Sequence, residues 1–403
     1  MGLHFIKTDK FKTSIINILI RRQLSRGEVT KNALIVNILR NGSAKYPSIR
    51  EVNNATEQMF GSIFDIQVVK KSEEQMFQFY FEFLAHDCGL LQKASEFLNE
   101  VIYRPLVENN MFKEQDFRLE KDILNQMIIG RVNNKSTYAR ERCIEIMCKG
   151  EPFGLYADGY TEDLDKITNK ALFEHYENVL KTSPIEVIVL GAHEKEDLSR
   201  YYGSGQGQVN EIELPVNYFK KSEVKRQTDY LNVLQNKICI GLRVNGKAEG
   251  ADFFKMLIFN EILGGGSSSL LFRKVREEEN LCYYIHSILY RFKSIIIIES
   301  GIDNTEKAED IIVKLIWAIA GGDFTEPDVA EAKKSIIKKF NALKDKQAGS
   351  LDFYISNYLA GDSRTIDESI SEIEKINRGD VLNIAEDIYI DTVYYLMGGE
   401  AYA

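Results

Sequence analysis

Hydrophobic and polar residues follow one another along this chain in two patterns, one typical of strands and one of helices. The runs SIINILIRR and KSIIIIESGID are rich in β-branched residues and predict a partly covered and a buried strand. In DVAEAKKSIIKKFNALKDK, apolar residues recur every three or four positions, which predicts a helix that packs through one face. The segment ADFFKMLIFNEIL is apolar nearly all round and favours a helix buried on several sides.

The same order of elements occurs twice, because short motifs of the first half return in the second. ILRNGS at 38–43 matches ILGGGS at 262–267, an offset of 224 residues. MFKEQDFRLEKDILNQMI, from Met111, matches DFTEPDVAEAKKSIIKKF, from Asp323, at an offset of 212. A third pair, LDKITN and IEKINR, is 209 residues apart and keeps the same order. The chain is therefore expected to contain two copies of one αβ unit.

This repeat predicts an α+β fold of two homologous domains, each a mostly antiparallel sheet covered by helices. At 403 residues the chain also exceeds what one hydrophobic core usually supports. We place an N-terminal domain at residues 1–202, a linker at 203–223 and a C-terminal domain at 224–403. The linker prediction depends on the polar, glycine-rich run YYGSGQGQVN, which begins at residue 201.

Composition and charge exclude several classes of function. The net charge of −9, with no dense basic run, gives no attraction to nucleic acid or to an anionic membrane. No apolar stretch approaches the roughly 20 residues that a membrane-spanning helix needs. Five cysteines without a CxxC pair indicate reduced thiols rather than a disulfide framework. We expect a cytoplasmic protein that binds neither nucleic acid nor a membrane.

Beyond the repeat, three motifs carry a resemblance to a known family. They are LFRKVREEENLCYYIHS, LQNKICIGLRV and GEPFGLYADGYTEDLDKIT. With the repeat, they resemble the insulinase (pitrilysin) family of inverzincin metallopeptidases, and most of all its small two-domain bacterial branch. The resemblance covers essentially the whole chain. It implies that the two domains form one half-shell of a clamshell that two chains complete.

In that family, zinc is held by an H-x-x-E-H motif on a helix, with a third carboxylate on a later helix. Two histidines four apart face one ion, and the glutamate between them activates water. Aligned through the ILRNGS turn, the motif positions hold ALIVN, residues 33–37, and the third-ligand region offers Asn125 or Gln126. No two of the five histidines lie four apart. We therefore predict that this chain binds no catalytic zinc, has no catalytic residue of its own and is inactive alone.

A second part of the family's machinery matches this chain residue for residue. The resemblance implies that Arg276 and, seven residues later, Tyr283 contact substrate near the scissile bond. A guanidinium and a phenol can stabilise negative charge on a carbonyl oxygen, but they cannot generate a nucleophile. Alternatively, Arg276 and the acidic run 277–279 form a solvated helix end with weak ion pairs. We favour substrate binding; His286 either flanks this site or packs.

The glycine-rich turn before Arg276 has two interpretations. In the mitochondrial processing peptidase, the silent subunit carries a glycine-rich loop at a similar place that helps to bind precursor peptides. Gly264, Gly265, Gly266 and Ser267 are candidates for a comparable role. Equally, a tight turn between helices needs residues that tolerate positive φ. The turn is not a phosphate-binding P-loop, because no Lys-Ser/Thr pair follows the glycines.

Two hypotheses of function follow from the resemblance. In the first, the chain is the non-catalytic, substrate-binding subunit of a heterodimeric peptidase, and a partner carrying H-x-x-E-H supplies the zinc and the general base for cleaving peptides. In the second, it is a structural or maturation factor, similar to zinc-less members associated with elongation factor P modification or bacteriocin maturation, and binds a partner without cleaving it. Which peptide is bound, and whether the chain pairs with itself in isolation, stay open.

Overall fold

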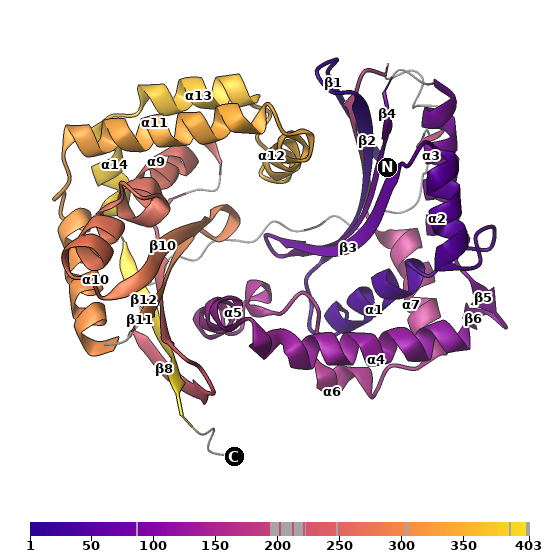
Figure 1. Ribbon diagram of the computed structural model, residues 1–403, viewed down its shortest axis with the longest axis horizontal. Coiled ribbons are helices and arrows are strands. Elements are labelled where there is room, and N and C mark those ends of the chain that lie inside the picture. The colour runs from indigo at the N-terminus through magenta and orange to yellow at the C-terminus, as the bar shows by residue number, and fades with distance from the viewer. Residues whose placement is uncertain are drawn as a thin grey trace. The chain divides into compact units, whose positions relative to one another are not determined.

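The computed structural model describes residues 1–85, 88–193, 201–202, 212, 221, 223–246, 249–302, 305–386 and 388–399. The chain divides into two compact units (Figure 1). The first contains Met1–Arg131 and Leu155–Pro215, and the second contains Val132–Gly154 and Val216–Ala403. Most of the predicted linker at 203–223 lies outside the described residues.

The first unit is built on a five-stranded sheet in the order β1-β7-β2-β4-β3. Its first strand pairs in parallel with its last, and all other neighbours are antiparallel. The strands are β1 (Gly2–Lys7), β2 (Thr13–Gln23), β3 (Ile63–Lys71), β4 (Glu74–Leu84) and β7 (Ile185–Gly191). A short hairpin, β5 (Val107–Glu108) and β6 (Met111–Phe112), stands apart from this sheet.

Helices of the first unit pack against alternate side chains of the sheet. Ile16, Ile18 and Ile20 of β2 point into one core, together with four phenylalanines of β4 at positions 77, 79, 81 and 83. This two-residue period is what a strand with one face on a core requires. The helices are α1 (Val29–Leu39), α2 (Ile49–Gln58), α3 (Cys88–Tyr103), α4 (Glu114–Gly130), α6 (Thr161–Leu164) and α7 (Asn169–Thr182).

The second unit repeats the topology of the first, strand for strand. Its sheet has the order β10-β11-β9-β12-β8, and again the first and last strands pair in parallel. The strands are β8 (Lys225–Leu231), β9 (Asn236–Arg243), β10 (Cys282–Tyr290), β11 (Ile295–Ile302) and β12 (Tyr389–Gly398). The α+β fold predicted from the repeat, with two mostly antiparallel sheets covered by helices, is confirmed.

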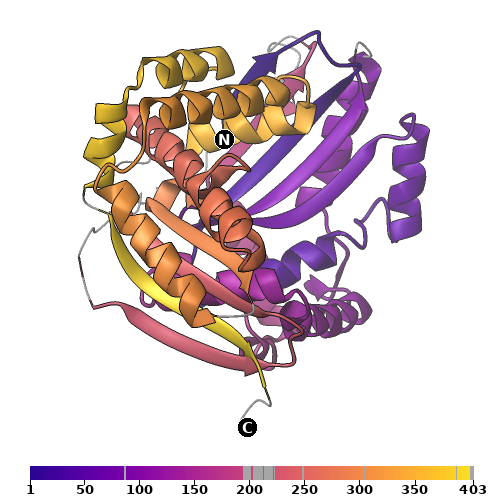
Figure 2. The ribbon, with the colours of Figure 1, turned by 60° about the vertical axis from the view of Figure 1, so that its left-hand side comes forward.

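One face of the second sheet is covered by helices from the same half of the sequence. Ile238, Ile240 and Leu242 of β9 pack into this core, and α11 and α13 run side by side (Figures 1 and 2). The helical segments are α9 (Gly250–Asn260), η3 (Glu261–Gly265), η4 (Phe272–Glu278), η5 (Arg291–Lys293), α10 (Thr305–Ala320), α11 (Glu326–Leu343), α12 (Gln347–Leu359), α13 (Ile366–Lys375) and α14 (Arg378–Ala385). Within the described segments, no helix combines the length and apolar character needed to cross a membrane.

The opposite face of the second sheet is covered by a segment from the first half of the sequence. This segment holds η1 (Arg131–Asn133), α5 (Lys135–Met147) and η2 (Pro152–Gly154). Cys143 and Met147 of α5 share a buried cluster with Cys239 and Ile297 of the sheet. The sequence-based bounds put this segment in the N-terminal domain, but its apolar face contacts the second sheet.

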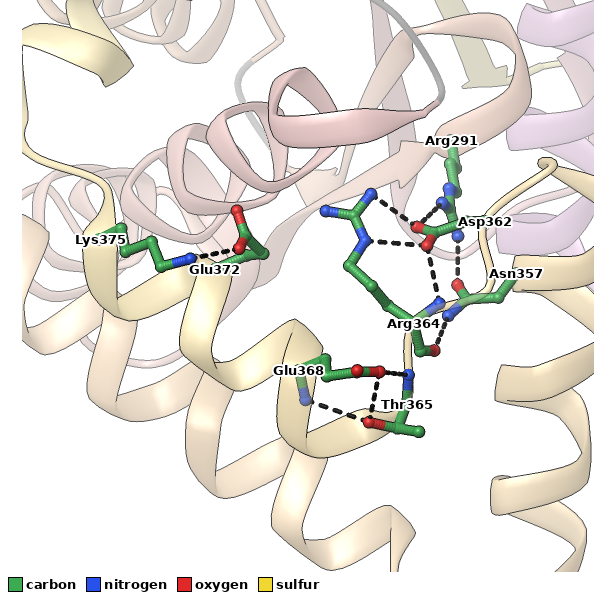
Figure 3. Close-up of polar contacts among 8 residues, drawn as sticks. All are labelled: Arg291, Asn357, Asp362, Arg364, Thr365, Glu368, Glu372 and Lys375. Carbon is green, nitrogen blue, oxygen red and sulfur yellow. Dashed lines mark hydrogen bonds and ion pairs between the residues drawn. The ribbon is translucent and has the colours of Figure 1, made fainter.

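A buried ion-pair cluster holds the turn between α12 and α13 (Figure 3). The carboxylate of Asp362 accepts hydrogen bonds from Arg364 at 2.8 Å and Arg291 at 3.0 Å. Asn357 links the two ends of this turn, because it accepts from Arg291 and donates to the backbone oxygen of Arg364. Burial opposes ionisation of Asp362, but the hydrogen bonds and charges of the two arginines outweigh it and lower its pKa.

Candidate functional site

The positions that hold zinc in the resembled family have become part of the hydrophobic core. Ala33, Leu34, Ile35 and Val36 of α1 are buried in the core of the first unit. On α4, Gln126 is exposed to solvent and Asn125 is half-buried. In the part of the chain that the structure describes, no group of three or more His, Cys, Asp or Glu side chains is arranged to hold a metal ion.

A neutral hydrogen-bond network lies beside the former motif. His175 of α7 bonds through its Nε2 to Oδ1 of Asn32 at 2.8 Å, and Asn32 donates to Gln75 of β4 at 2.8 Å. Burial lowers the pKa of His175 from 6.5 to about 4. The imidazole is therefore neutral at pH 7, and its Nε2–H is the donor that Asn32 requires. These three side chains satisfy one another rather than a metal.

Arg276 and Tyr283, which the sequence singled out, line one hollow in the second unit. The hollow has a volume of about 580 Å³ and is lined by Gln235, Phe272, Arg276, Glu277 and residues 280–283. Tyr283 is 83% exposed. Within the described residues, neither Arg276 nor Tyr283 forms a hydrogen bond or an ion pair. The structure thus places both residues at one hollow.

The local backbone explains how two residues seven apart come to share this hollow. Arg276 lies on η4, a π-helical turn that closes with a hydrogen bond from the Glu279 amide to the Lys274 carbonyl at 3.1 Å. Asn280 then adopts a left-handed conformation, with φ of 53°, and reverses the chain into β10. π-Helical turns occur mostly as single turns and are frequent at functional sites.

Arg276 has no ion-pair partner among the described residues. Its guanidinium lies 4.5 Å from the ring centroid of Phe272, four residues earlier on the same turn. The surrounding cations are each paired: Arg273 with Asp328, Lys274 with Glu278, and Lys307 with Glu279. Glu278 and Glu279 of the acidic run therefore pair with lysines and not with Arg276. Phe272 was not among the residues predicted from the sequence, although an aromatic residue four positions before an arginine on a helical segment is a usable signal.

Tyr284 and His286 belong to a different contact from Tyr283, because their side chains emerge from the other face of the strand. The hydroxyl of Tyr284 is hydrogen-bonded to Ser136 at 2.8 Å. His286 lies 3.0 Å from the carboxylate of Glu299, which also pairs with Arg140 of α5. Burial opposes ionisation of Glu299, but the hydrogen bond from His286 and the charge of Arg140 hold its pKa below the ordinary value. His286 does not line the hollow at Arg276 and instead contacts Glu299, the carboxylate that also pairs with Arg140.

The glycine turn is explained by close packing rather than by positive φ. Gly264 has a φ of −157°, and a side chain at this position would place its Cβ 2.8 Å from the backbone nitrogen of Ser287 in β10. At Gly265 the Cβ would lie 2.3 Å from the Glu261 carboxylate. Lys339 of α11 fixes the turn by donating to Glu261 at 2.7 Å and to the Gly265 carbonyl at 3.0 Å. Ser267 is exposed, and residues 264–267 do not line the hollow at Arg276.

Known proteins are similar to this chain in sequence or in fold. A family model described as "Peptidase M16 inactive domain" matches residues 166–336. A Bacillus subtilis (strain 168) protein named "Probable inactive metalloprotease YmfF" is 29% identical, over 98% of this chain and 96% of that protein. "Uncharacterized zinc protease YmxG", from the same strain, is 20% identical over 70% of each chain. A solved structure of a conserved protein from Enterococcus faecalis V583 has a TM-score of 0.90 at 23% identity, over 98% of this chain and 96% of that one.

These likenesses, together with the repeated sheet topology, show that the chain has an M16-like two-domain fold. The H-x-x-E-H motif of that class is absent, and its positions on α1 are aliphatic and buried apart from the half-buried Asn37. The chain is similar to the insulinase (M16) family, and one of its relatives is named a probable inactive metalloprotease. The resemblance seen in the sequence is confirmed.

Proposed function

We propose that this chain is the non-catalytic, substrate-binding subunit of a heterodimeric insulinase-family zinc peptidase that acts on peptides. The observation that carries the proposal is the contrast between the two units. Around Arg276 and Tyr283, donors without partners line an open hollow, whereas the zinc positions on α1 are filled with core side chains. A chain kept only for structure has no need of an exposed, unpaired guanidinium beside an exposed phenol.

The chemistry of the hollow complements what a zinc-bearing partner supplies. When zinc-bound water attacks a peptide carbonyl, negative charge grows on the carbonyl oxygen, and fixed N–H and O–H donors stabilise that charge. The partner is a chain with H-x-x-E-H, which provides the zinc and the general base. Relatives of both kinds exist in one organism, since Bacillus subtilis has the proteins named a probable inactive metalloprotease and a zinc protease. We place the complex in the cytoplasm.

Co-expression of this chain with an H-x-x-E-H insulinase-family chain from the same genome tests the proposal. We expect the two to co-purify, with zinc on the partner alone, and only the mixture to cleave a quenched fluorescent peptide. Arg276→Ala is expected to leave assembly intact and to slow cleavage about tenfold to a thousandfold, as loss of an oxyanion donor does.

Arg273→Ala is the matched control, because Arg273 lies on the same π-helical turn but is paired with Asp328 and does not line the hollow. It is expected to leave cleavage within about twofold of the wild type. Cleavage that is unchanged by Arg276→Ala would contradict the proposal. A stable complex that cleaves no peptide would instead favour the structural or maturation factor, which binds without cutting.

A further inference from the structure

We propose that the hollow at Arg276 recognises a carboxylate of a peptide, carried next to an apolar side chain. The proposal rests on the proposed function in taking a peptide as the ligand, and it adds the chemical feature that the hollow selects. Arg276 is the single cation among the residues that line this hollow. Its positive charge has no counter-ion within the described residues. An anionic ligand can therefore form an ion pair with Arg276 that no side chain of the described residues forms.

The stacking on Phe272 favours a carboxylate over a less structured anion. The central carbon of the guanidinium lies over the Phe272 ring, 4.5 Å from its centroid, and the N–H groups have no hydrogen-bond partner within the described residues. A planar guanidinium offers two parallel donors that match the two oxygens of a carboxylate. Lysine, with a single flexible ammonium, cannot reproduce this geometry.

The other polar groups of the hollow select against a multiply charged ion. Glu277 lines the same hollow and has no partner within the described residues. A phosphate or sulfate beside Arg276 would meet the negative charge of Glu277, whereas a peptide carries a single carboxylate together with backbone N–H groups that this glutamate can accept. The pair of one free cation and one free anion thus fits a peptide segment better than an inorganic ion.

The apolar part of the lining defines the neighbour of that carboxylate. Phe272 and Leu281 are partly exposed, and Tyr283 is largely exposed. Burial of a leucine or phenylalanine side chain against them removes apolar surface from water. Two sources supply a carboxylate beside such a side chain: the C-terminus of a peptide that ends in an apolar residue, or an internal aspartate or glutamate flanked by one.

Binding of labelled peptides to the full chain, without a partner, tests the inference by fluorescence anisotropy. The two peptides of the first pair share one ten-residue sequence of Gly, Ser and Ala that ends in Phe-Leu. One has a free C-terminal carboxylate, and the other has a C-terminal amide. The second pair is amidated at the C-terminus and carries an internal Glu-Phe or Gln-Phe. We expect the carboxylate form of at least one pair to bind about tenfold to a hundredfold more tightly than its neutral match. The pair that shows the preference identifies the source.

Variants connect the preference to this hollow. Arg276→Ala is expected to abolish the preference, Arg276→Lys to retain a fraction of it, and Arg273→Ala to leave it unchanged. Equal binding of charged and neutral forms, a preference that survives Arg276→Ala, or no binding of any peptide at millimolar concentration would each overturn the inference. If the preference appears but the mixed complex cleaves nothing, the proposed function fails and the carboxylate site stands. If cleavage depends on Arg276 but the charged and neutral forms bind equally, the inference fails and the proposed function stands.

Discussion

Replacement of Gly264 by alanine tests whether the glycine turn is a packing device. The new Cβ would lie 2.8 Å from the Ser287 backbone nitrogen and 2.7 Å from its hydroxyl oxygen, closer than side-chain carbons approach other atoms. Ser287 belongs to β10, which is hydrogen-bonded to β11, so its backbone cannot retreat without disturbing the sheet. Overpacking in a tight core costs about 1–3 kcal/mol, and we expect the upper part of this range for Gly264→Ala.

Gly266→Ala is the matched control two residues away. Its Cβ would approach only the Glu261 carboxylate, at 3.2 Å, so a loss below about 1 kcal/mol is expected. The protein has one tryptophan, Trp317 on α10, and its fluorescence during urea unfolding reports on the unit that contains the turn. Equal unfolding midpoints for the two variants would refute the packing explanation. Loss of peptide binding at wild-type stability in Gly264→Ala would support the glycine-rich loop as a binding element instead.

Two further substitutions test the buried polar groups. Asp362→Asn removes the charge of a buried carboxylate, 2% exposed, that pairs with both Arg291 and Arg364, and should cost about 3–5 kcal/mol in urea unfolding. Glu372→Gln breaks only the outer pair with Lys375 (Figure 3), so a cost above about 1 kcal/mol would contradict this ranking. The pKa of His175 is about 4 in the folded protein, whereas its ordinary value is 6.5. As the pH falls from 6.5 to 4, the unfolded chain therefore binds a proton at His175 before the folded protein does. The free energy of unfolding decreases over this pH range. From pH 7 to 4.5 we expect a loss of about 2–3 kcal/mol by circular dichroism, which His175→Gln should abolish.

The hydrophobic pattern and the repeat were sufficient to predict the architecture. Within KSIIIIESGID, the residues Ile295–Ile302 form β11 and are buried throughout, and SIINILIRR lies in β2 and is buried over most of its length. The helix predicted at DVAEAKKSIIKKF is α11, which starts at a capping box formed by Thr325 and Asp328. These elements could be predicted because the spacing of apolar residues indicates which face of a strand or helix is buried. The strand order was not predicted, but it is the same in both units because two copies of one sequence pattern fold in the same way.

The candidate site could be predicted only in part. The resemblance singled out Arg276 and Tyr283, and both line one hollow, but the reason that they share it lies in backbone geometry. A regular α-helix would put residues seven apart on one face, two turns along the axis. Here a π-helical turn and the left-handed Asn280 bring them together across a chain reversal. Asparagine tolerates the left-handed conformation, but no residue pattern predicts a π-helical turn. Side-chain periodicity therefore could not predict how Arg276 and Tyr283 come to line one hollow.

The placement of α5 shows why periodicity does not determine which unit a helix joins. The buried positions Ala139, Cys143 and Met147 recur every four residues and predict one covered face, whichever sheet covers it. Residues distant in sequence determine which sheet α5 packs against. Gly241 leaves room for the Met147 side chain, and Arg243 donates a hydrogen bond to the Met147 carbonyl at 3.1 Å. The second unit is therefore built from two separate stretches of the chain. Its sheet, whose strand β10 contributes Cys282 and Tyr283 to the Arg276 hollow, depends on Met147, which lies 94 positions before Gly241 in the sequence.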